Sequence, residues 1–182
     1  MILADLQSRV RIALTNTLVE EWSLFAPTTG TSRPSARTLA FHLGWYLRQM
    51  VPREWSVDSE YDRSGMLLER SVALGVDVPN LIVHHRGLLG PEHNLLLMHV
   101  AVDDADEDRP ALAAAQALQH RFGYRYAVLL DLRLEVEGRE AAVTPYWQWS
   151  TLETGADTNL AVPVYIPRVL AEITRRSRRP ED

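Results

Sequence analysis

The sequence contains no cysteine and no lysine. Without cysteine the chain forms no disulfide bond and no thiolate metal site, and a reducing compartment suits it. All 19 basic residues are arginine. This excludes any chemistry that needs a lysine ammonium, because arginine holds a positive charge but does not give up a proton.

Long apolar runs and excess positive charge are also lacking. No run approaches the roughly 20 apolar residues of a membrane span, and the first residues lack a signal-peptide core. The formal charge of −5 argues against a generally basic surface for nucleic acid. A length of 182 residues with 46% hydrophobic content suits one globular domain. We therefore expect a cytoplasmic protein with no membrane contact.

Two apolar runs separated by turn residues predict a buried β-hairpin. The runs are Leu81–Val83 and Leu95–Val102, and the loop between them contains two glycines. Strand periodicity places Asn80, Ile82, His84 and Arg86 on one face of the first strand, and Leu95, Leu97, His99 and Ala101 on one face of the second. Polar side chains thus lie on otherwise apolar strands, where a site is expected.

The two segments read PNLIVHHRG from Pro79 and NLLLMHVA from Asn94. They resemble the metal-binding hairpin of the PD-(D/E)XK nuclease superfamily, the restriction-endonuclease-like fold, and more narrowly a bacterial group within it. The resemblance implies an α/β (α+β) fold, with a mixed sheet flanked by helices in the order helix, three strands, helix, strand. It also implies a metal-binding Asp, a Glu and a Lys. This sequence has Asn80, His99 and Ala101 at those positions.

These three replacements remove the groups that the resemblance assigns to catalysis. Mg²⁺ prefers anionic oxygen ligands, whereas asparagine is neutral, histidine suits zinc or manganese, and alanine has no functional group. Losing one preorganised electrostatic group typically costs about 10²–10³ in rate. We therefore predict a pseudonuclease with no catalytic residues, no metal and no cofactor. It is expected to act as a protein-interaction, regulatory or structural subunit.

Other parts of the chain extend the resemblance. The segment from Trp55 to Arg63 is similar to the family pattern V-D-x-E-Y-N-R, and Glu60, His84 and Arg86 survive from the family. The family's Glu-Arg pair at the start of the preceding helix reads Ala36-Arg37. Alternation predicts Trp55, Val57 and Tyr61 on one face of the strand, and Ser56, Asp58 and Glu60 on the other. Glu60 either pairs with a nearby arginine such as Arg63 or Arg86, or retains an active role.

The remaining elements follow from periodicity and turn residues. Helices are predicted over residues 2–24, from a Ser35 cap to about 50, over 112–120, and after 163–167; strands are predicted over 122–130 and 141–150, with a turn at Glu137-Gly138. Trp147 and Trp149 share a face, which favours packing over base stacking. The whole chain, 1–182, reads as one domain, with an N-terminal part (1–34), a nuclease-like core (35–134) and a C-terminal part (135–182).

Two other functions stay open. A non-cleaving nucleic-acid-binding module would use Arg175, Arg176, Arg178 and Arg179 on phosphates, although the acidic run Asp103–Asp108 and the net charge disfavour it. A metal-dependent nuclease with relocated ligands would use Glu60, His84 and His99, if the two histidines face each other across the hairpin. A protein partner is the leading expectation, and self-association is left open.

Overall fold

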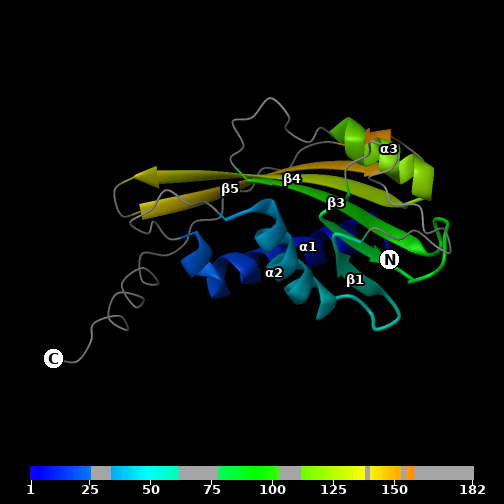
Figure 1. The fold of residues 1–182 in the computed structure, drawn as a ribbon, viewed down its shortest axis with the longest axis horizontal. Coiled ribbons are helices and arrows are strands. Elements are labelled where there is room, and N and C mark those ends of the chain that lie inside the picture. Colours follow the sequence, from blue (N-terminus) through cyan, green and yellow to red (C-terminus); the bar gives the residue numbers. More distant parts are fainter. Residues whose placement is uncertain (26–33, 62–77, 103–111, 138–139, 153–154, 158–182) are drawn as a thin grey trace.

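A six-stranded mixed sheet forms the centre of the molecule, with helices on both of its faces. The computed structural model describes residues 1–25, 34–61, 78–102, 112–137, 140–152 and 155–157. Helices α1 (Leu3–Glu20) and α2 (Ala36–Arg48) lie on one side of the sheet, and α3 (Leu112–Phe122) lies on the other (Figure 1). The predicted mixture of helices and strands is confirmed.

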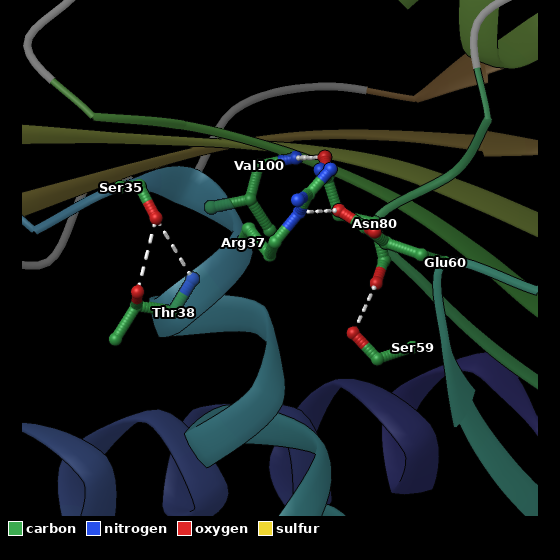
Figure 2. Close-up of polar contacts among 7 residues, drawn as sticks. All are labelled: Ser35, Arg37, Thr38, Ser59, Glu60, Asn80 and Val100. Atoms are coloured by element: carbon green, nitrogen blue, oxygen red, sulfur yellow. Dashed lines mark hydrogen bonds and ion pairs between the residues drawn. The ribbon is translucent and has the colours of Figure 1, made fainter.

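The two N-terminal helices follow from their apolar periodicity and from one cap. In α1, Leu6, Val10, Leu14 and Leu18 are buried on one face, and a 3₁₀ turn over Trp22–Leu24 follows. In α2, the Ser35 hydroxyl accepts a hydrogen bond from the Thr38 amide at 3.1 Å (Figure 2). A serine cap typically contributes about 1 kcal/mol. The predicted helix start at Ser35 is confirmed.

The strands occur in the sheet in their sequence order. They are β1 (Ser56–Ser59), β2 (Leu81–His84), β3 (Asn94–Val102), β4 (Tyr126–Glu137), β5 (Glu140–Thr151) and β6 (Gly155–Asp157). The β3–β4 pair is parallel and bridged by α3, and all other neighbouring pairs are antiparallel. The predicted hairpin near residues 80–102 and the second hairpin, over β4 and β5, are both present. From α2 to β4 the observed order is helix, three strands, helix, strand.

Two apolar clusters fill the spaces above and below the sheet. The larger one joins α1 and α2 to the sheet and includes Trp147 and Trp149, whose rings lie 6.2 Å apart. The smaller one joins α3 to the opposite face through Ile82, Leu97 and Ala127. The two tryptophans are therefore core residues, as the packing interpretation predicted.

Three predicted details were wrong because the backbone is locally irregular. Glu60 has a φ of 48°, which interrupts alternation, so Tyr61 packs in the smaller cluster, away from Trp55 and Val57. A bulge between β2 and β3 lets Leu95 join the larger cluster, opposite Leu97.

The third error concerns the helix that precedes β4. This helix continues to Phe122, and Gly123, with a φ of 68°, ends it. β4 therefore starts at Tyr126 and runs to Glu137, later and longer than predicted.

Several sequence predictions fall outside the described residues. These are the arginines at 175–179, the acidic run 103–108, Arg63, and the helix after 163–167. Within the described part, no helix is both long enough and apolar enough to cross a membrane.

Candidate functional site

Glu60, which the sequence resemblance singled out, forms an ion pair with a helix rather than joining the polar side chains of the hairpin. Its left-handed backbone directs the carboxylate toward the first turn of α2, where Arg37 Nε donates to Glu60 Oε1 at 2.5 Å (Figure 2). The Glu60 amide also donates to the Asn80 carbonyl at 3.2 Å. The pair with a nearby arginine, one of the two interpretations of Glu60, is present in the structure with Arg37 as the partner.

Asn80 forms hydrogen bonds that connect β3 to the end of β1. Its Oδ1 accepts a hydrogen bond from the Val100 amide of β3 at 2.7 Å (Figure 2). Its carbonyl oxygen accepts from the Ser59 hydroxyl at 3.0 Å. Because a side-chain oxygen here replaces a strand carbonyl, Asn80 continues the β2–β3 ladder by one residue beyond Leu81.

His99 and Ala101 lie on the face of β3 that α3 covers. Both are 3% exposed. In the parallel β3–β4 register, His99 pairs with Leu129 and Ala101 pairs with Asp131. Partners in register carry their side chains on the same face of a sheet. A carboxylate that the sequence analysis did not single out, Asp131, thus lies beside the position where the resemblance expects a lysine.

A second polar cluster lies where β1 and β2 meet, and Asp58 is at its centre. His84 Nε2 is 2.8 Å from Asp58 Oδ2, and Arg86 Nε donates to the same oxygen at 2.8 Å. The Arg86 Nη2 group also contacts Asp58 Oδ1. The Tyr61 ring packs edge-on against His84, with centroids 4.6 Å apart. This cluster unites His84 and Arg86, as predicted, with an aspartate that was assigned only to a strand face.

Burial and hydrogen bonding set the protonation of this cluster. Burial acts to raise the pKa of Asp58, but the hydrogen bonds from Arg86 and His84 outweigh it and hold the pKa below its ordinary value. Burial lowers the pKa of His84, and the bond to Asp58 offsets this only in part. Because a carboxylate only accepts, neutral His84 carries its proton on Nε2. Burial also raises the pKa of Tyr124, so its phenol stays protonated.

The strand register separates the two histidines of the relocated-ligand hypothesis. His84 pairs with Asn94, whereas His99 lies on β3 beyond Met98, the partner of Leu81. A spacing of five residues along β3 corresponds to roughly 17 Å. His84 and His99 therefore do not face each other. Among the described residues, no three histidine, aspartate or glutamate side chains group closely enough to hold a metal ion.

The sequence analysis placed Asp58 on one face of its strand with Ser56 and Glu60, and His84 on the polar face of the next strand. Only the register of β1 against β2, with Asp58 opposite Ile82, brings the two together. Comparison of the chain with protein-family models, with curated proteins and with solved structures found no match.

Proposed function

We propose that this chain is a non-catalytic protein of the restriction-endonuclease-like fold that acts as a protein-binding subunit. The order helix, three strands, helix, strand from α2 to β4 supports the fold part of the proposal. So does the sheet, in which neighbouring strands follow sequence order and β3 and β4 are parallel.

The proposed absence of catalysis is supported by the charge balance around Glu60. In the family pattern, an aspartate at position 80 and a glutamate at position 60 would need a divalent cation between them. Here Asn80 is neutral and holds a backbone amide, and the Glu60 carboxylate is neutralised by Arg37. The polar groups of Glu60 and Asn80 therefore have partners within the protein and need no metal cation, which favours a structural role for both residues.

The proposal is tested by hydrolysis assays on the purified chain. Single- and double-stranded DNA and RNA are incubated with Mg²⁺ or Mn²⁺, beside a Glu60→Ala, His99→Ala double variant prepared identically. We expect no cleavage above the level of the double variant. Metal-dependent cleavage that the double variant lacks would overturn the proposal. A partner captured from the native host must then form a complex with the purified chain at defined stoichiometry.

One observation favours a second function, a metal-dependent nuclease that uses Asp131 and His99 rather than Glu60 and His84. Asp131 supplies a carboxylate in register with Ala101, on the same face as His99. However, Arg133 Nε lies 3.5 Å from Asp131 Oδ2, which already supplies that carboxylate with a cation. The alternative predicts that Asp131→Asn abolishes a metal-dependent activity that Glu60→Ala leaves intact. The same assays therefore distinguish the two functions.

A further inference from the structure

The outer face of α2 carries a stripe of exposed side chains. Phe41 and Trp45 are 60% and 64% exposed, and Arg37 and Arg48 are exposed on either side of them. Residues at i, i+4, i+8 and i+11 lie on one face of a helix, so these four form a continuous line about 16 Å long. We call Arg37, Phe41, Trp45 and Arg48 the α2 stripe.

The stability of α2 explains only part of this stripe. Arg48 in the last turn complements the helix dipole, but Arg37 lies in the first turn, where a cation is unfavourable. Leu39, Leu43 and Leu47 already supply the buried face of the helix. Two large aromatic rings one turn apart in water contribute nothing to that packing. Adjacent exposed aromatics of this kind mark interaction surfaces.

The charges of the stripe indicate the chemistry of its partner. Helix α2 contains no acidic residue, although the whole chain has a formal charge of −5. Arg37 is 76% exposed and contacts Glu60 through Nε, so its Nη groups can donate to a second carboxylate. Cations at both ends with apolar rings between them complement a helix that has apolar residues in its centre and carboxylates at both ends.

We propose that the α2 stripe binds an acidic amphipathic helix of a partner protein. The inference rests on the proposed function, because it names the surface and the partner chemistry of that protein-binding subunit. The partner helix would place two apolar side chains on Phe41 and Trp45 and its carboxylates on Arg37 and Arg48.

Two other occupants fit the stripe less well. In a twofold pairing of α2 with a second copy of itself, antiparallel helices would bring Arg48 of one copy toward Arg37 of the other, and like charges oppose this. A nucleic-acid strand over 16 Å carries about five phosphates at duplex spacing. The stripe offers cations only at its ends, whereas strand-binding grooves follow the backbone with positive charge.

The test uses a synthetic 16-residue helical peptide with leucine and phenylalanine four residues apart and glutamates eleven residues apart. A matched peptide has lysine for each glutamate. Trp45 reports binding by its fluorescence, because the other four tryptophans, Trp22, Trp55, Trp147 and Trp149, are buried. Peptide anisotropy gives a second readout that works for every variant. A single-stranded DNA oligonucleotide and vesicles of anionic phospholipid are titrated in parallel.

We expect saturable binding of the acidic peptide only. Trp45→Ala and Arg48→Glu should each weaken it about tenfold or more, and added salt should weaken it further. Leu88→Ala, an exposed apolar residue outside α2, is the control and should change affinity less than about twofold. Circular dichroism checks that each variant is folded. We expect all of them to fold, because the substituted side chains are exposed.

Three results would overturn the inference: no binding of the acidic peptide, binding unchanged by both stripe variants, or tighter binding of the oligonucleotide or the vesicles. None of these would reinstate a nuclease. Conversely, cleavage in the hydrolysis assay would remove the proposed function while leaving the peptide measurement to stand alone. The two failures are thus distinguishable.

Discussion

Replacing Asp58 by alanine should destabilise the fold by about 1–4 kcal/mol. The Asp58 side chain is only 14% exposed, and it accepts hydrogen bonds from both His84 and Arg86. Removing the carboxylate leaves the buried Nε2–H of His84 without an acceptor, at a cost of about 1–3 kcal/mol. The Arg86 side chain is 63% exposed, so its ion pair adds no more than about 1 kcal/mol.

Urea denaturation followed by circular dichroism measures this loss. In a chain of this size, each kcal/mol should lower Tm by about 2–4 °C, which gives a second estimate. Arg86→Gln should cost at most about 1 kcal/mol, and Asp5→Ala, which removes an exposed pair with Arg9 on α1, should cost less than about 0.5 kcal/mol. If Arg86→Gln costs as much as Asp58→Ala, or Asp58→Ala costs under about 1 kcal/mol, the buried bond to His84 is not the source of stability.

The same cluster should make stability depend on pH. Both Asp58 and His84 have a folded-state pKa below the ordinary value. Each therefore contributes stability that is fully present above its unfolded pKa and is lost as pH falls through the folded pKa. For His84 the loss begins near pH 6.5, and for Asp58 near 3.8. His84→Gln should flatten the profile between about pH 7.5 and about pH 5. Parallel profiles for wild type and His84→Gln would contradict the assignment.

Three further substitutions test the packing around the site. Gly44→Ala would place a Cβ 2.7 Å from Leu81 Cδ1, so it should destabilise by about 1–3 kcal/mol in thermal melts, although alanine favours helices by about 1 kcal/mol. A stabilised variant would show that Leu81 moves freely. Asn80→Ala should cost about 1–3 kcal/mol in urea, because the Val100 amide loses its acceptor, and no loss would mean that water replaces it. Glu60→Gly should be about 1 kcal/mol more stable than Glu60→Ala in the same assay, and equal stabilities would mean that the left-handed backbone is unstrained.

Regular elements were predictable from the sequence because burial imposes a period. The leucine spacing of α2 and the Ser35 cap fixed that helix, and the apolar runs fixed the β2–β3 pair. The predicted side-chain faces were wrong after Glu60 and at Leu95. At both positions the backbone departs from a regular strand, through a positive φ and through a bulge, and the identity of neither residue signals this.

The site was less predictable than the fold because its contacts cross between strands. The sequence singled out His84 and Arg86, but their acceptor, Asp58, depends on the register of β1 against β2. Asn80 was identified only as the replacement of a metal-binding aspartate, whereas its Oδ1 accepts a hydrogen bond from the Val100 amide of β3. Period-2 reasoning assigns a face to each side chain, but it does not say which neighbour the side chain reaches.

The backbone at Glu60 shows that position 60 is not optimised for folding alone. A left-handed conformation costs a residue with a Cβ roughly 1–2 kcal/mol, and glycine avoids that cost. The pair with Arg37, mostly exposed on the arginine side, returns no more than about 1 kcal/mol. The backbone hydrogen bond from the amide of residue 60 to the Asn80 carbonyl does not depend on the side chain, so glycine would keep it. The Glu60 carboxylate contacts Arg37 Nε, and this contact orients Arg37 at one end of the α2 stripe. The Glu60–Arg37 ion pair thus connects the backbone around Glu60 to the proposed binding surface.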